Sequence, residues 1–464
     1  MCNNFTRVWR TIFPPPPATP VVQTCERNRG RLEARCLQVG DASSAAVEFP
    51  FVEQVGRLTR CVDSDRNPAA QVVTEYLLCS RPAGQMGAAM MLEADRRYWG
   101  IEKGLHLRLD VIAGEDRSRV RHRTSAFTQI ECWQALQASP PFADLTPRSR
   151  AILKTVLNGK NGIATRHLAL EPLAEVFELT PDALLERFSR HAPALASEAG
   201  QSALGAASIS AAEVDGVIVS TCTGYLCPGL TSYVAERLGL RPDLLALDLV
   251  GQGCGAALPN LRTASGLVES GRCEHVLCVC VEVCSAAFYI DNDPGVLISA
   301  CLFGDGAGAA VVSRQARSNG RQVEWKADGS VLAPQDRDLL RFETKGGMLR
   351  NVLSPAVPQL AARHARSVFR AVTERAKVEP SQINGWILHA GGREVLKALQ
   401  EEFGLPDYSV RHSGRILGEF GNISSPFVLF TLKAALEDNA PGGLWWLASF
   451  GAGFSSHGAI LEVR

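Results

Sequence analysis

An alternation of strand and helix patterns begins near residue 105 and occurs twice, and it constrains the fold of this 464-residue chain more than any other feature. Its strands are continuous apolar runs such as VDGVIVS at 214–220, which is typical of strands that are covered on both faces. This order predicts an α/β chain with a mostly parallel sheet between layers of helices. In the first half the sequence predicts strands at 105–112, 214–220, 244–250, 275–283 and 307–312, and helices at 126–137, 147–157, 182–199, 231–238 and 255–270.

The same pattern returns after residue 360. The predicted strand GWILH at 385–389 takes the place that VDGVIVS takes in the first half, so the two parts resemble diverged copies of one unit. No short repeat of the kind that builds solenoids is visible. The second half predicts helices at 359–376, 394–403 and 423–436, and strands at 385–389, 444–450 and 457–463.

Residues 1–104 differ from the rest because their strand and helix periodicity is weak. Four prolines at 14–17 block helices and sheet ladders, and an arginine-rich stretch follows. We interpret 1–104 as a poorly ordered extension that is dispensable for activity. Two alternatives remain: an upstream stretch from a wrong start codon, and a transit peptide, since the first 25 residues are rich in Arg, Pro and Thr and lack acids.

The charge balance of the chain excludes several classes of partner. Lys and Arg number 48 and so do Asp and Glu, and a net charge of zero argues against nucleic acid or a membrane surface as the main partner. No apolar run reaches the roughly 18 residues of a membrane span. The 14 cysteines are mostly interpreted as small buried hydrophobes of a cytoplasmic protein, since none pairs with histidine at the spacing of a metal site.

One cysteine has a distinctive setting. Cys254 lies in GQGCGAALP, directly after a predicted strand and at the start of a predicted helix. The flanking glycines allow a sharp turn that leaves the side chain uncovered, and the N-terminal end of a helix stabilises a thiolate. Pro259 fits the first turns of that helix. Cys254 is therefore a candidate nucleophile, and the alternative is a structural cysteine in a glycine-rich turn.

Two further polar residues stand at strand–helix junctions. His389 ends the strand GWILH, and the carboxyl end of a parallel strand is where α/β sites are built. The alternative for His389 is a hydrogen-bonded core histidine. Asn422, in GEFGNISSP, precedes a predicted helix, and its alternative is a helix N-cap.

The combination of Cys254, His389 and Asn422 in a duplicated α/β chain resembles the thiolase-fold condensing enzymes. Within them the chain is similar to the type III polyketide synthases, the chalcone and stilbene synthase family. The resemblance covers about residue 105 to the C-terminus. It rests on GQGCGAALPNL around Cys254, CVEVCSAAF at 280–288, LFGDGAGAA at 302–310, GWILHAGG around His389, FGNISSPFVLF around Asn422 and SFGAGFSSHG at 449–458.

The resemblance implies a thiolase fold, in which two duplicated βαβαβαββ halves form a five-layered αβαβα core. The first half would be 105–315 with the nucleophilic Cys254, and the second 316–464 with His389 and Asn422. Members of the family are homodimers, act on small-molecule CoA thioesters, and need no metal or redox cofactor.

The resemblance also implies the role of each site residue. A starter acyl-CoA would acylate Cys254, which His389 would hold as a thiolate by forming a thiolate–imidazolium pair. His389 and Asn422 would then donate hydrogen bonds to the enolate that forms when malonyl-CoA loses CO2. The carbanion would attack the acylated Cys254, and several rounds would precede cyclisation.

The resemblance places further residues in the substrate cavity. Phe303 matches an aromatic wall that excludes water and orients malonyl-CoA, and Lys160 falls near a lysine that binds a CoA phosphate. Ser424, Thr223, Cys227, Cys284 and Ala287 are assigned to substrate binding. Cys227 replaces a methionine that reaches into the partner subunit's cavity in plant enzymes, and Cys284 and Ala287 replace threonines. SFGAG at 449–453 replaces the usual GFGPG loop.

The smaller, more apolar side chains predict a bacterial-type enzyme that takes a long aliphatic starter and makes resorcinol- or pyrone-type products. Two alternatives remain. One is a single-round β-ketoacyl synthase of the fatty-acid initiation type, or an enzyme similar to hydroxymethylglutaryl-CoA synthase. In the initiation enzymes Gln-Ala-Asn typically follows the histidine, whereas Ala-Gly-Gly follows His389. The other is a non-catalytic thiolase-fold subunit, which the presence of Cys254, His389 and Asn422 together argues against.

Overall fold

The structure is a computed structural model that describes residues 21–28, 31–41, 54–64, 67–79, 88–92, 124–170, 172–315 and 321–464. The chain divides into two compact units, Met1–Asp110 and Val111–Arg464. The predicted strand at 105–112 and the boundary at residue 104 lie outside the described residues. Within the described parts, no helix has both the length and the apolar character to cross a membrane.

The first unit contains an antiparallel sheet of four strands, although the weak periodicity of its sequence predicted no element there. The strands follow the chain order, so each pairs with the next. Leu37, Leu58 and Leu92 are buried in its core. That the unit is dispensable for activity stays a prediction. The strands are β1 (Val21–Asn28), β2 (Arg31–Asp41), β3 (Gln54–Ser64) and β4 (Asn67–Cys79).

The second unit contains two four-stranded sheets, and seven of their eight strands confirm predicted ones. The strand at Val323–Leu332 was not predicted. The first sheet has the order β10-β9-β7-β8, with β7 parallel to β8 and β9 and with β10 antiparallel. Its strands are β7 (Gly216–Thr221), β8 (Leu245–Val250), β9 (His275–Glu282) and β10 (Gly306–Ser313).

The second sheet has the order β11-β16-β15-β14, and only β14 and β15 are parallel. The expectation of a mostly parallel sheet therefore holds for the first sheet, where only β10 is antiparallel, and is wrong for the second. The reason is local: the short turn Ala452–Phe454 joins β15 to β16, and so short a connection can link only antiparallel neighbours. The strands are β11 (Val323–Leu332), β14 (Ile383–Leu388), β15 (Gly443–Gly451) and β16 (Ser455–Val463).

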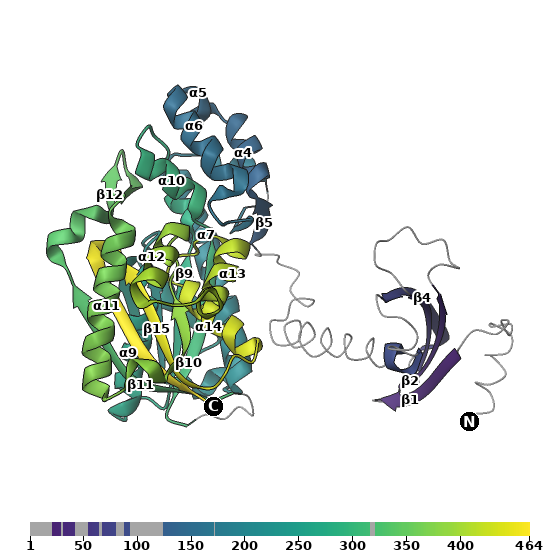
Figure 1. The fold of residues 1–464 in the computed structure, drawn as a ribbon. Helices are drawn as coiled ribbons and strands as arrows, with labels where there is room; N and C mark the ends of the chain where they lie inside the picture. The colour runs from purple at the N-terminus through teal and green to yellow at the C-terminus, as the bar shows by residue number, and fades with distance from the viewer. Residues whose placement is uncertain are drawn as a thin grey trace. The chain divides into compact units, whose positions relative to one another are not determined.

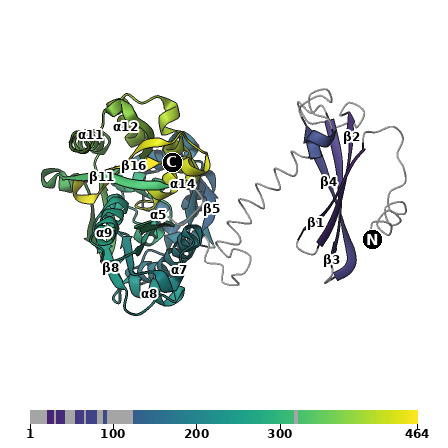
Figure 2. The ribbon, with the colours of Figure 1, turned by 90° about the horizontal axis from the view of Figure 1, so that it is seen from below.

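The elements of this unit stack in five layers, which confirms the predicted αβαβα core (Figures 1 and 2). Helices α9 (Ala257–Glu269) and α14 (Phe427–Glu437) lie between the two sheets and share one apolar cluster with both. The outer face of the first sheet packs on α7 (Pro181–Ala207) and α8 (Leu230–Leu238). The outer face of the second packs on α11 (Val357–Ala376) and α12 (Arg393–Phe403).

Strand alternation explains why the sheets are buried on both faces. In β7, Ile218 belongs to the central cluster, whereas Val217 and Val219 belong to the outer cluster. Successive side chains of a strand point to opposite faces, so an apolar run such as GVIVS supplies both clusters. This is the physical basis of the pattern from which the layered fold was predicted.

Two helix boundaries differ from the prediction for local reasons. The helix predicted at 126–137 begins only at Gln129, because 125–128 form a strand and Thr128 caps the helix. The helix predicted at 423–436 begins at Phe427, because Ser424 has a positive φ of 57° and cannot start a right-handed helix.

Smaller elements cover one end of the second unit, and the sequence did not predict most of them. They are β5 (Ser125–Thr128), α4 (Gln129–Gln137), α5 (Pro140–Ala143), α6 (Pro147–Thr155), η3 (Val156–Lys160), β6 (Thr165–Leu168), η4 (Leu173–Phe177), η6 (Gly253–Gly255), η7 (Cys284–Ala287), α10 (Pro294–Leu302), β12 (Leu340–Lys345), β13 (Met348–Leu353) and α13 (Arg411–Phe420).

Candidate active site

Cys254 lies in a single helical turn, η6, between β8 and α9, as the sequence predicted. Gly253 has a φ of +56°, and a Cβ there would lie 2.5 Å from the backbone nitrogen of Ala452. A Cβ on Gly255 would lie 3.0 Å from the nitrogen of Gly451. Only glycine allows this close approach, so the Cys254 turn packs directly against the end of β15.

The thiol of Cys254 has one polar neighbour from the second half of the chain. The hydroxyl of Ser424 donates a hydrogen bond to Sγ over 3.2 Å. Removal from bulk water raises the pKa of the Cys254 thiol to about 12.

His389 directly follows β14 and is almost completely buried, with 1% of its surface exposed. Its ring meets the rings of Phe427 and Phe450, each with a centroid distance of 5.2 Å. Neither ring nitrogen has a hydrogen-bond partner among the described residues, and burial lowers the pKa of His389 to about 3. A hydrogen-bonded core histidine, the alternative left open by the sequence, is therefore not what the structure contains.

Asn422 is buried and held by two hydrogen bonds of its side-chain amide. Its Nδ2 donates to the carbonyl of Gly391 over 2.9 Å, and its Oδ1 accepts from the backbone N–H of Ser424 over 2.9 Å. The residue that caps α14 is Pro426, so Asn422 is not the helix N-cap that was its alternative reading. The amide instead ties the segment after His389 to the segment that carries Ser424.

The three predicted catalytic residues therefore come from loops that pack on one another. The Cys254 turn lies on the end of β15, His389 packs on Phe450 of the same strand, and Asn422 bonds Gly391. Both pKa shifts favour a neutral thiol and a neutral imidazole. They oppose the thiolate–imidazolium pair that the sequence suggested, because burial penalises both charges.

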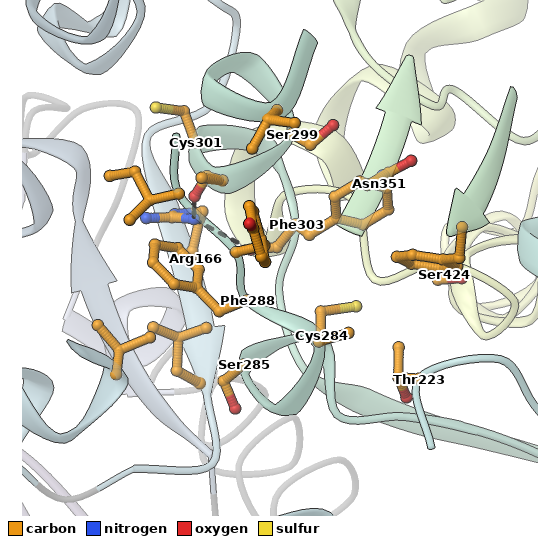
Figure 3. A pocket seen from close by; sticks show the side chains of 18 of the residues that line it. Arg166, Thr223, Cys284, Ser285, Phe288, Ser299, Cys301, Phe303, Asn351 and Ser424 are labelled. Carbon is orange, nitrogen blue, oxygen red and sulfur yellow. Dashed lines mark hydrogen bonds between the residues drawn. The ribbon is translucent and has the colours of Figure 1, made fainter. Parts of the chain in front are cut away.

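One cavity connects Cys254 to the helices at the end of the unit, and it encloses about 1120 Å³ of empty space when the space at its mouth is counted. Cys254 and five of the predicted substrate residues line it: Phe303, Thr223, Cys284, Ala287 and Ser424. Figure 3 shows Thr223, Cys284, Phe303 and Ser424 around this space. The tertiary structure thus brings together residues that lie up to 201 positions apart, from Thr223 to Ser424.

Comparison with known proteins decides the family. A family model described as "FAE1/Type III polyketide synthase-like protein" matches residues 146–327, and that of "Chalcone and stilbene synthases, C-terminal domain" matches 332–460. The 1,3,6,8-tetrahydroxynaphthalene synthase of Streptomyces peucetius subsp. caesius is 31% identical over 319 residues, covering 68% of this chain and 84% of that protein. The chain belongs to the type III polyketide synthases.

Two further comparisons agree with this assignment. The crystal structure of the tetrahydroxynaphthalene synthase of Streptomyces coelicolor A3(2) is similar, with a TM-score of 0.67 and 25% identity, over 74% of this chain and 98% of that one. An α-pyrone synthesis polyketide synthase-like protein of Mycobacterium tuberculosis is 27% identical over 322 residues, covering 66% of this chain and 80% of that protein. The chain is thus a condensing acyltransferase with the thiolase fold.

One predicted site residue of this polyketide synthase does not line its own cavity. Cys227 is exposed on the loop after β7 and does not line the cavity. Its predicted role in the partner subunit's cavity stays a prediction. Lys160 ends η3, and its side chain lies outside the described residues, so its predicted contact with CoA also stays a prediction.

Glu282 is a site residue that the sequence analysis did not identify. It is fully buried at the end of β9, and burial raises the pKa of its carboxyl group. The backbone N–H of Cys222 and the hydroxyls of Thr223 and Ser425 donate to it over 3.0, 3.0 and 2.7 Å. The oxygen of Ser424, whose single proton points to Cys254, lies 3.3 Å from it. A charged residue that ends an otherwise apolar strand was the signal, since such a residue is rarely buried without partners.

We expect Glu282→Ala to lower the free energy of unfolding by about 3 kcal/mol, because several buried donors lose their acceptor. Denaturant unfolding of the full chain would measure this. Glu236→Ala is the matched control, since Glu236 is exposed on α8 and should change stability by less than about 0.5 kcal/mol. Equal stability of the two variants would show that this hydrogen-bond network does not stabilise the fold.

Proposed function

We propose that this type III polyketide synthase loads an acyl-CoA starter on Cys254, extends it with malonyl-CoA and cyclises the product within one cavity. The observation that carries the proposal is that Cys254, Phe303 and Ser424 line the same cavity. His389 and Asn422 do not line it, but His389 packs on Phe450 of β15, whose end contacts the Cys254 turn, and Asn422 bonds Gly391. A covalent thioester divides the condensation into two easier steps.

In the loading step the sulfur of Cys254 attacks the thioester carbon of the acyl-CoA. We propose that the neutral imidazole of His389 takes the thiol proton as the new C–S bond forms, because burial disfavours a standing ion pair. The bond to the CoA sulfur breaks, and the proton returns from His389 to the leaving CoA thiolate. The imidazole is neutral again, with one N–H donor available.

In the extension step the C–C bond to the malonyl carboxylate breaks and CO2 leaves. Its electron pair remains on the thioester as an enolate, to which the N–H of His389 and the amide of Asn422 would donate. One hydrogen of Asn422 Nδ2 is bound to Gly391, and the other remains for the substrate. The enolate carbon then attacks the acyl carbon on Cys254, and the Cys254 thiolate is the leaving group.

These bonds form and break without a metal or redox cofactor, so we propose that CoA thioesters are the only small molecules required. We also propose a homodimer, as the family resemblance implies. The exposed position of Cys227 on the loop after β7 supports this, because a partner subunit could reach it.

We propose a long-chain aliphatic starter and a resorcinol- or pyrone-type product. The far wall of the cavity supports this, because it is apolar and comes from α4, α6, η3 and η4. The name of the mycobacterial relative, which refers to α-pyrone synthesis, supports the pyrone-type product. The wall residues include Cys132, Leu136, Leu153, Leu157, Val176 and Phe177.

A bulkier side chain in that wall should narrow the cavity and make the enzyme prefer a shorter starter. We expect Leu157→Phe to lower acylation by long-chain acyl-CoA at least about tenfold relative to butyryl-CoA, because one extra aromatic ring in a packed wall costs about 1–3 kcal/mol. Product profiling with starters of graded length measures this. Leu157→Met keeps the side-chain volume and is the matched control.

The same profiling tests the proposed function. Products that carry several malonyl-derived units on a long alkyl chain are expected. Turnover of only aromatic starters would contradict the long-chain proposal. Release after a single condensation, or a requirement for acyl carrier protein, would contradict iterative extension.

A further inference from the structure

Arg166 is a buried cation in the wall of the substrate cavity. It lies in β6, only 6% of its surface is exposed, and it lines the same cavity as Cys254 and Phe303. Figure 3 shows its guanidinium beside Phe303 and Cys301. The sequence analysis assigned it no role.

One nitrogen of this guanidinium is used by the fold. Nη1 donates to the carbonyls of Ala300 and Phe303 over 2.7 and 3.1 Å. Nε is buried and has no partner, and Nη2 makes no hydrogen bond within the described residues. Among the described residues, no carboxylate lies within 4.0 Å of the Arg166 guanidinium, and its hydrogen-bond partners are the two carbonyls.

A second arginine of the same cavity shows the contrast. Arg341 in β12 also lines it. Asp338 and Glu343 lie 3.2 and 2.9 Å from its nitrogens, so its charge is compensated by the fold. Among the described residues, Arg166 has no such compensation.

The unused edge of Arg166 has a specific chemistry. An arginine keeps its charge at any ordinary pH, and Nε and Nη2 present two parallel N–H groups in one plane. This fork matches two oxygens of a planar anion. A buried cation without an anion is unfavourable in free energy, so a substrate that supplies an anion should bind here more tightly than a neutral one.

We propose that the Nε–Nη2 edge of Arg166 binds a planar two-oxygen anion of the acyl substrate. Two sources share this chemistry: the carboxylate of a dicarboxylic acyl group, and the enolate of the 1,3-dicarbonyl unit that each condensation creates. The inference rests on the proposed function, since it takes the cavity to be the place where the acyl chain lies.

The position of Arg166 relative to the reaction supports this assignment. Phe303, whose carbonyl binds Arg166, also forms a bridge with Asn422. Arg166 thus binds the residue whose backbone pairs with a proposed oxyanion donor, and it lines the same cavity as Cys254. A 1,3-dicarbonyl chain in an otherwise apolar wall needs such donors, because an unpaired polar group there is unfavourable.

Acylation of Cys254 by three CoA thioesters of similar length tests the proposal. Butyryl-CoA has no further oxygen, succinyl-CoA adds a carboxylate, and acetoacetyl-CoA adds a 1,3-dicarbonyl. Intact-protein mass spectrometry gives the rates for wild type, Arg166→Met and Arg341→Met. We expect Arg166→Met to lower the succinyl-to-butyryl or the acetoacetyl-to-butyryl rate ratio about 10- to 100-fold, the loss typical of a charged hydrogen-bond pair.

The ratio that falls identifies the source of the anion. Arg341→Met should leave both ratios unchanged. Unchanged ratios in Arg166→Met, or an equal fall in both arginine variants, would overturn the proposal. If Arg166→Met does not fold, a measurement on the wild-type enzyme replaces it: the rate at which an alkylating reagent modifies Cys254 in the presence of succinate, acetylacetone or butyramide. We expect succinate or acetylacetone to protect Cys254 more than butyramide does. Equal protection by all three would overturn the proposal. A wild-type enzyme that neither these three thioesters nor a long-chain acyl-CoA acylates would contradict the proposed function instead, and acylation by the long-chain acyl-CoA alone would overturn the Arg166 proposal.

Discussion

Cys254→Ala is expected to abolish product formation, with a loss of at least about 1000-fold, because no other group can carry the acyl intermediate. Its place in η6 explains the size of the effect: the turn is held by backbone contacts of Gly253 and Gly255, so alanine changes the nucleophile and leaves the turn unchanged. Product assays with malonyl-CoA and a starter acyl-CoA measure the loss.

Cys284→Ala is the matched control for this variant. Cys284 is buried and lines the same cavity, but the proposed mechanism does not require its thiol. Cys254→Gln should separate the two half-reactions, since it blocks loading while the proposed donors for malonyl decarboxylation remain. Product formation by Cys254→Ala would show that another residue accepts the starter.

Loss of either oxyanion donor should slow decarboxylation about 100- to 1000-fold. The variants are His389→Ala and Asn422→Ala, each in the Cys254→Gln background, where CO2 release from malonyl-CoA reports decarboxylation alone. The expected loss follows from burial: both residues are at most 2% exposed, and a donor in such a site acts on the developing charge without competition from water.

Ser425→Ala is the matched control for these donors. The Ser425 hydroxyl donates to Glu282 over 2.7 Å and has no proposed contact with substrate. Its variant should therefore keep the rate of CO2 release within a few-fold of the Cys254→Gln parent. Unchanged CO2 release in both donor variants would remove His389 and Asn422 from the decarboxylation step.

Sequence patterns predicted the strands of the catalytic unit well because their burial on two faces leaves a local signal. GVIVST and HVLCVCVE are apolar except at their ends, and both are strands that are buried along their whole length. The first unit lacked that signal, since its strands, such as RLEARCLQVGD, mix charged and apolar residues. Its antiparallel sheet comes from pairing between segments, which no single segment reveals.

Asn422 shows where local reasoning was incomplete. Its position before a helix suggested an N-cap, yet the helix begins five residues later, at Phe427, and the amide binds Gly391. The deciding feature is the positive φ of Ser424, which also directs the Ser424 hydroxyl to Cys254. A backbone angle of this kind depends on packing around the segment, and the sequence alone does not specify it.

The sequence by itself determined the layered α/β fold, the family and the three candidate catalytic residues, because each of these depends on local motifs and periodicity. Only the tertiary structure decided the mixed order of the sheets, the cavity and the environments of Glu282 and Arg166. Glu282 collects donors from two separate segments, those of Cys222 and of Ser425, and Arg166 faces a cavity with one edge of its guanidinium unused among the described residues. Whether a charged side chain is compensated depends on which distant groups meet it, and that is a property of the folded chain.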